Sequence, residues 1–144
     1  MPFRQSFCSI TLVLLSLSFF SIGKTKNDNK AGHAKIYIYR VGQFSSAANN
    51  YTIFIDGEQF CKLSNNKYIL AEVPAGVHKV SAQLGFSVFK KEAEVEIDAK
   101  EDTSYYISCY VKTGLTKTNF KMLEVAETTA RLQMKDLGRD NCRD

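Results

Sequence analysis

Between residues 35 and 125 the chain consists of short runs of β-branched and aromatic residues, with turn residues at intervals of about ten residues. Within several runs apolar and polar residues alternate with a period of two, which is typical of a strand that buries one face. The alternation is strict in Glu92–Asp98 (EAEVEID), where every second residue is acidic. The pattern predicts strands at residues 35–40, 51–55, 58–63, 67–73, 77–84, 86–97, 105–111 and 119–125.

Turn signals separate these runs. Asp56-Gly57 is the strongest of them, because this dipeptide supplies the positive φ angles that a two-residue type I′ hairpin demands. We expect it to fold residues 51–55 back onto residues 58–63. Further turns are expected at residues 64–66 (SNN) and 74–76 (PAG).

After the last predicted strand the apolar period changes from two to three or four residues, which is the helical period. Apolar residues from Ala126 to Leu137 follow this spacing, and Gly138 is placed to end the helix. The predicted fold is therefore all-β: an antiparallel β-sandwich of seven to eight short strands, immunoglobulin-like, with a short C-terminal helix that covers one edge or end.

The first residues have the three parts of an export signal. Arg4 gives a positive start, Ile10–Phe20 is an apolar run, and residues 21–23 (SIG) provide small side chains before the cleavage point. The apolar run is shorter than the ~20 residues that span a bilayer, and Cys8 precedes it. We therefore expect no permanent membrane anchor and no lipid-modified cysteine, and an extracytoplasmic product, periplasmic or secreted.

The chain then divides into four parts. Residues 1–23 are the predicted signal peptide, and residues 24–34 (KTKNDNKAGHA) are a polar linker without a periodic apolar residue. Residues 35–125 form the predicted β-sandwich domain, and residues 126–144 form the C-terminal helix and a polar tail. The length allows one domain.

The charge distribution excludes one class of partner. The chain carries a formal net charge of +4, from 19 Lys and Arg against 15 Asp and Glu. The basic residues are scattered among acidic ones, and Lys90-Lys91 is the only adjacent basic pair after the leader. A nucleic-acid-binding protein would gather its basic residues into a stripe or patch, so we expect no nucleic-acid partner.

No motif for catalysis, cofactor binding or metal binding is present. The chain lacks the C-x-x-C, H-x-H and H-E-x-x-H spacings of zinc sites, the G-x-S-x-G elbow and the glycine-rich phosphate loops. The acidic residues of Glu92–Asp98 share one strand face, and like charges in a row favour water over an acid–base pair. We therefore expect no catalytic residue, no metal, no cofactor and no enzymatic activity.

Three cysteines follow the predicted leader: Cys61, Cys109 and Cys142. An exported domain allows one disulfide with three pairings, or three free thiols. Cys109 shares its strand face with Ile107, and Cys61 alternates with Leu63, so both should point inward, whereas Cys142 lies in the polar tail. If a disulfide forms, we predict that it joins Cys61 and Cys109.

Four residues are candidates for contact with a ligand or partner. Arg40 ends an apolar strand, and His78 lies on the apolar face of its own strand. Tyr106 and Tyr110 share a strand face, in a chain with seven tyrosines and no tryptophan. Each has a structural alternative: a packed or paired Arg40, a hydrogen-bonded His78, and tyrosines at the border of the core.

Five segments, taken in order, carry a family resemblance: Ile36–Arg40 (IYIYR), Ile53–Gly57 (IFIDG), Leu63–Tyr68 (L-x-x-x-K-Y), Val73–His78 (VPAGVH) and Tyr105–Ile107 (YYI). The order resembles the bacterial domain of unknown function 2846 family of exported, often lipid-anchored proteins. The Asp-Gly hairpin and the Gly-x-His strand are also similar to PEGA-type β modules. The resemblance implies a β-sandwich at the cell envelope and supplies no catalytic residue. The chain departs from it by lacking a lipid-attachment cysteine.

The residues and the resemblance together favour a non-catalytic binding or structural module of the cell envelope, whose partner is an envelope protein or a glycan. Two alternatives stay open. One is a glycan- or peptidoglycan-binding domain that uses exposed tyrosines. The other is an enzyme whose site assembles around Arg40 and His78 without a recognisable motif.

Overall fold

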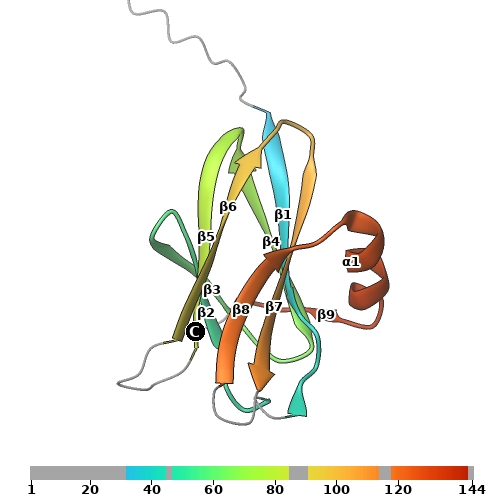
Figure 1. Ribbon diagram of the computed structural model, residues 1–144. Coiled ribbons are helices and arrows are strands. Elements are labelled where there is room, and N and C mark those ends of the chain that lie inside the picture. The colour runs from blue at the N-terminus through green and yellow to red at the C-terminus, as the bar shows by residue number, and fades with distance from the viewer. Residues whose placement is uncertain (1–31, 45–46, 85–90, 114–117, 143–144) are drawn as a thin grey trace, which may run out of the picture.

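In the computed structural model the described residues are 32–44, 47–84, 91–113 and 118–142, which form a two-layered β-sandwich with a helix on one side (Figure 1). The predicted signal peptide and residues 24–31 of the predicted linker lie outside the described residues. The elements are β1 (His33–Arg40), β2 (Tyr51–Ile55), β3 (Glu58–Leu63), β4 (Lys67–Pro74), β5 (Gly76–Leu84), β6 (Lys91–Ala99), β7 (Ser104–Thr113), β8 (Thr118–Glu124), α1 (Glu127–Met134) and β9 (Gly138–Arg139).

Two sheets make up the sandwich. The five-stranded sheet has the order β8-β7-β1-β4-β9, and the four-stranded sheet has the order β3-β2-β5-β6. The predicted all-β sandwich with a short C-terminal helix is confirmed, with one difference: β1 pairs in parallel with β7, and β4 in parallel with β9. Alternation within a strand records which face is buried but not the direction of its neighbour, so the sequence did not reveal these parallel pairs.

The hydrophobic core lies between the sheets and is filled by alternate residues of β1 to β8. The predicted inward face of β7 is confirmed, because Ile107, Cys109 and Val111 are buried. The predicted wet face of β6 is confirmed as well, because its four acidic side chains are exposed. β1 begins two residues earlier than expected, and Ala34, placed in the predicted linker, is fully buried in the core.

The hairpin between β2 and β3 has the predicted turn. Asp56 has φ 52° and Gly57 has φ 86°, so both residues have the positive φ that a type I′ turn needs. The turn therefore brings β2 and β3 together as an antiparallel pair.

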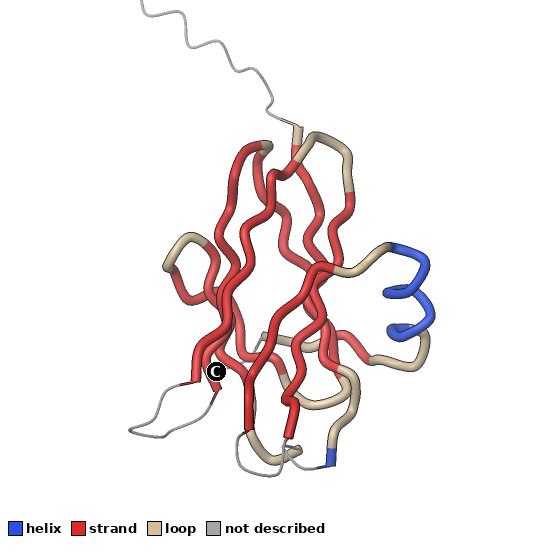
Figure 2. The backbone as a smooth tube through the Cα atoms, viewed as in Figure 1, coloured by secondary structure: helices blue, strands red, loops and turns tan. Residues whose placement is uncertain are grey.

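The C-terminal segment differs from its prediction. α1 lies against the outer face of the five-stranded sheet (Figure 2) and ends at Met134, with Lys135 as its C-cap. Gly138 does not stop the helix but begins β9, which pairs with Lys67 and Tyr68 of β4. The start of the predicted polar tail is thus part of a sheet. A strand of two residues is too short to show an alternating pattern, so the sequence did not predict it.

No helix in the part of the chain that the structure describes has the length and apolar character needed to cross a membrane.

Candidate functional site

Arg40 lies inside the core. Its side chain is fully buried, its guanidinium carbon lies 3.9 Å from the centre of the Tyr51 ring, and its Nη1 donates a hydrogen bond to the Asn49 carbonyl at 2.5 Å. Burial lowers the pKa of Arg40 from its ordinary value, because the charged form loses hydration. Arg40 therefore anchors the loop before β2, and its charge does not reach the surface.

His78 joins two turns. Its Nδ1 lies 2.7 Å from Asp56 Oδ2, in the β2–β3 turn, and its Nε2 lies 2.9 Å from the Pro74 carbonyl, in the β4–β5 turn. Both partners are acceptors, so the imidazolium form, which donates from both nitrogens, satisfies both. Hydrogen bonding to Asp56 raises the pKa of His78, and the same bond lowers the pKa of Asp56.

The structure does not bring Arg40 and His78 together. Arg40 lies opposite Lys67 in the β1–β4 register, at one end of β4. Pro74, whose carbonyl is bonded to His78, lies at the other end of the same strand. Seven residue steps at about 3.3 Å each separate these ends by more than about 20 Å. Arg40 and His78 therefore do not belong to one site.

Tyrosines on the outer face of the five-stranded sheet form the surface on which α1 packs, which we call the seat of α1: Tyr37, Tyr39, Tyr68 and Tyr106. Tyr39 and Tyr106 are buried with Ala130 of the helix, and the Tyr37 ring stacks on the Tyr106 ring at 5.1 Å. The phenolic hydroxyls also have partners on the helix: Tyr39 donates to Gln133 Oε1 at 2.5 Å, and Tyr106 donates to Glu127 Oε1 at 3.3 Å. The expected exposed tyrosine surface is corrected at Tyr106, which is only 5% exposed.

Tyr110 lies on the same face of β7 but beyond the helix. It is half-buried and lines a pocket of about 590 Å³ between the loop after β1, strands β7 and β8, and α1. We call this the Tyr110 pocket. Val41 and Leu123 give it apolar walls, and Ser108 and Thr129 add hydroxyl groups. None of the described residues that line it carries a formal charge at neutral pH.

Gln43 fixes one wall of the Tyr110 pocket. Its side-chain Nε2 donates to the Val111 carbonyl at 3.1 Å, and its Oε1 accepts from the Val111 N–H at 2.9 Å. The main-chain N–H of Gln43 donates to Asn65 Oδ1 at 3.0 Å. The side-chain amide thus continues the pairing with β7 where β1 has ended, and sequence reasoning missed it because a single Gln in a loop has no pattern.

Cys109 borders the pocket from the core side as a free, buried thiol. Burial raises the pKa of Cys109 to about 12, and the nearby positive charge of Arg40 offsets only part of this effect. The thiolate is the nucleophilic form of cysteine, so Cys109 is chemically inert at neutral pH.

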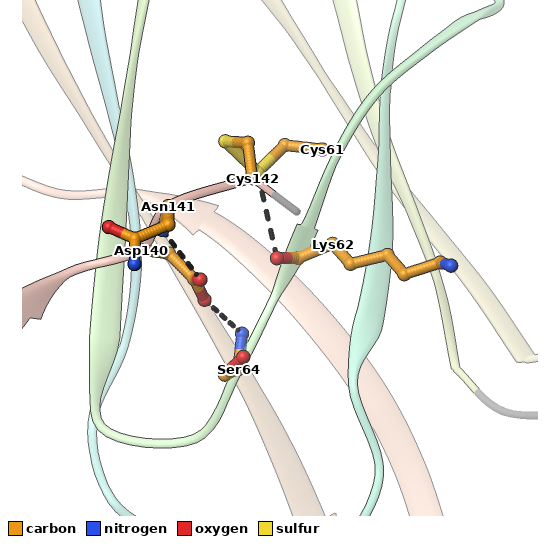
Figure 3. The surroundings of a disulfide bond; sticks show 6 residues. All are labelled: Cys61, Lys62, Ser64, Asp140, Asn141 and Cys142. Atoms are coloured by element: carbon orange, nitrogen blue, oxygen red, sulfur yellow. Dashed lines mark hydrogen bonds between the residues drawn. A yellow bond between two sulfur atoms is a disulfide. The ribbon is translucent and has the colours of Figure 1, made fainter. Parts of the chain in front are cut away.

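The predicted disulfide partner was wrong. Cys61 is bonded to Cys142, with their Cα atoms 4.9 Å apart (Figure 3). Cys61 lies on β3, which runs beside β4, whereas Cys109 lies on β7, two strands from β4 in the other sheet. Cys61 and Cys109 are therefore separated by two strand spacings within a sheet, about 10 Å, and by the gap between the two sheets, also about 10 Å. Each of these separations exceeds the distance between Cα atoms that a disulfide can join.

The tail brings Cys142 to Cys61 in a defined way. The Asp140 N–H donates to the Tyr68 carbonyl at 2.8 Å. Asp140 Oδ2 accepts a hydrogen bond from the Ser64 N–H at 2.7 Å (Figure 3). Asp140 therefore binds the turn that joins β3 to β4 and holds the segment against both strands. These contacts connect residues far apart in sequence, so no local pattern indicated them.

Among the described residues no group of three or more His, Cys, Asp or Glu side chains could hold a metal ion. No curated protein and no solved structure matches this chain. A family model described as "Protein of unknown function (DUF2846)" matches residues 30–122, which is well over half of the chain and runs from β1 into β8. The α1 helix and Cys142 follow the matched segment. This protein therefore belongs to the DUF2846 family of proteins of unknown function.

Proposed function

We propose that this protein is a non-catalytic, extracytoplasmic binding module and that the Tyr110 pocket is its ligand site. The observation that carries the proposal is the make-up of that pocket, whose described lining residues are all uncharged at neutral pH. Apolar walls with a few polar groups are the usual form of a small-ligand site. A neutral ligand suits this pocket. A charged ligand would lose its hydration on binding and would find no opposite charge among the described lining residues.

A neutral glycan is the ligand class that these walls favour. The Tyr110 ring and the Leu123 side chain, which is 56% exposed, offer apolar area to the C–H faces of a sugar ring. Ser108 and Thr129 offer hydroxyl groups that both donate and accept hydrogen bonds. This version of the glycan alternative uses Tyr110 and leaves Tyr106 to the helix.

The groups that most often carry catalysis are engaged elsewhere, which supports a binding role. Both ring nitrogens of His78 are hydrogen-bonded. Arg40 is buried, and the raised pKa of Cys109 keeps its thiol protonated. A general base or nucleophile would need to be free to face the ligand.

The disulfide supports the extracytoplasmic part of the proposal. Disulfides persist in oxidising compartments and are rare in the cytosol. The Cys61–Cys142 bond agrees with the export signal that we expect in residues 1–23.

The test is a titration of the folded protein with two neutral tetrasaccharides, one of glucose and one of N-acetylglucosamine, by isothermal calorimetry. Thr129→Glu places a carboxylate at the pocket wall, whereas Thr128→Glu adds the same charge one residue earlier, outside the lining. We expect at least one sugar to bind and Thr129→Glu to weaken it by about tenfold or more. Thr129 is exposed in the free protein, and a bound sugar would cover the new carboxylate where no described lining residue carries a positive charge.

Thr128→Glu should bind as the unchanged protein does. The proposal fails if neither tetrasaccharide binds, or if the two variants weaken binding equally.

A further inference from the structure

The five-stranded sheet has one edge that is only partly covered. β9 pairs with Lys67 and Tyr68 at the start of β4. β1 pairs along the whole of one side of β4. On the other side, no described strand pairs with the residues from Ile69 to Pro74. A strand edge of this kind is a template for another extended chain.

The backbone groups at this edge can be assigned from their neighbours. The Tyr68 carbonyl accepts from the Asp140 N–H at 2.8 Å, and the Pro74 carbonyl lies 2.9 Å from His78 Nε2. Backbone groups alternate in direction along a strand, so Leu70 and Glu72 direct their N–H and C=O groups to the same side as Tyr68 and Pro74. Four backbone groups therefore face this edge between two carbonyls that are already used.

A groove runs beside these groups. A hollow of about 330 Å³ lies between β3 and β4, with Ile55 and Val73 among its apolar lining residues. Phe60 of β3, which is 42% exposed, separates it from a second hollow of about 460 Å³ next to Leu70 and the disulfide. We call the two hollows together the β4 edge groove.

The first hollow is lined by acidic residues, so it favours a positively charged partner. Glu58 and Glu72 line it, and neither has an ion-pair partner in the part of the chain that the structure describes. Asp56, the third acidic residue, is bonded to His78. No described basic residue lines this hollow, so a positive charge brought by a partner would be attracted.

We propose that the β4 edge groove binds an extended peptide segment of a partner protein, with basic and apolar side chains at alternate positions. The peptide adds a strand to the sheet through Leu70 and Glu72. Its apolar side chains pack on Phe60 and Val73, and its basic side chains face Glu72. A second copy of this chain fits less well, because pairing of two β4 edges would set acidic residues against each other. The proposal is independent of the Tyr110 pocket.

The probe is the peptide acetyl-Lys-Val-Lys-Val-Lys-Val-amide, titrated into the folded protein. We expect binding to slow hydrogen exchange at the Leu70 and Glu72 amides, and Glu72→Lys to weaken it by about tenfold or more. The matched control is Glu92→Lys on β6, which is an edge strand of the other sheet, far from β3 in the strand order, and carries an exposed acidic face. This control should leave binding unchanged.

Two further peptides separate strand addition from simple charge attraction. One is N-methylated at its lysines and the other at its valines, so each loses the N–H groups of one edge while the charge is kept. Strand addition predicts that one of the two no longer binds and the other still does. The proposal is overturned if the probe fails to bind, if both methylated peptides bind alike, if Glu92→Lys weakens binding as much as Glu72→Lys, or if a Glu-Val repeat binds equally well.

Discussion

Polar side chains at the ends of the sandwich hold neighbouring turns and loops by paired contacts. His78 connects the β2–β3 turn to the β4–β5 turn, and the Asp56 carboxylate that receives it also accepts the Lys79 N–H at 2.9 Å. Arg40 connects the end of β1 to the loop before β2. Each side chain thus replaces backbone pairing where the strands stop, and each is withdrawn from surface chemistry.

At this scale the His78–Asp56 pair predicts a pH dependence of stability. The raised pKa of His78 means that its contribution is complete below its ordinary pKa of 6.5 and is lost as pH rises through the higher folded value. The lowered pKa of Asp56 means that its contribution is present above 3.8 and is lost as pH falls through the lower folded value. The pair should stabilise most between about pH 4 and pH 6.5.

Urea unfolding of the unchanged protein and of His78→Gln measures this effect. Because Asp56 is 51% exposed and screened by water, the difference between the two proteins should be about 1 kcal/mol or less at pH 6. It should shrink as the pH is raised to 9. A difference that grows with pH would contradict the assignment of a charged His78.

At the scale of elements, α1 depends on its seat. A helix of eight residues is too short to be stable in water by itself. Its stability must come from packing against the tyrosines of β1 and β7, with Ala130 fully buried at the contact. The small Ala130 side chain lets the helix approach the Tyr39 and Tyr106 rings closely.

Ala130→Glu should therefore release the helix, because a carboxylate would be buried among tyrosine rings. Limited trypsin digestion should then cut at Arg131 in the folded sandwich much faster than in the unchanged protein. Leu132→Glu is the matched control, since Leu132 is on the same helix and is 73% exposed. Equal cleavage of the two variants would show that the seat does not hold the helix.

At the scale of the whole molecule, the C-terminal segment connects the two sheets. β9 pairs with β4 of the five-stranded sheet, and the disulfide joins the following residues to β3 of the four-stranded sheet. The bond spans 81 residues of sequence and so encloses most of the sandwich in one covalent loop. Closing a loop of this length restricts the unfolded chain strongly.

Cys142→Ser should lower the free energy of unfolding by about 4 kcal/mol in the chain-entropy account of disulfides. Cys142 is exposed, so the substitution leaves the core intact. Thermal unfolding with and without reductant gives the measurement: reductant should lower the melting temperature of the unchanged protein to that of the variant and leave the variant unaffected. A peptide map that links Cys61 to Cys109 would contradict the structure.

Local features of the sequence determined the positions of most strands and the hairpin turn. The bounds of β2 and β3 agree with prediction because alternation and the Asp-Gly dipeptide act over a few residues. The inward face of β7 and the wet face of β6 follow from the same alternation. These features depend only on each strand's own pattern.

Tertiary structure alone decided the partners of these elements. The pairing of Cys61 with Cys142, the parallel contact of β1 with β7, and the burial of Tyr106 under α1 each join segments far apart in the chain. The Tyr110 pocket and the β4 edge groove likewise arise where separate elements meet. A periodic pattern states which side of a strand is buried, but the residue that covers it is chosen only when the whole chain packs.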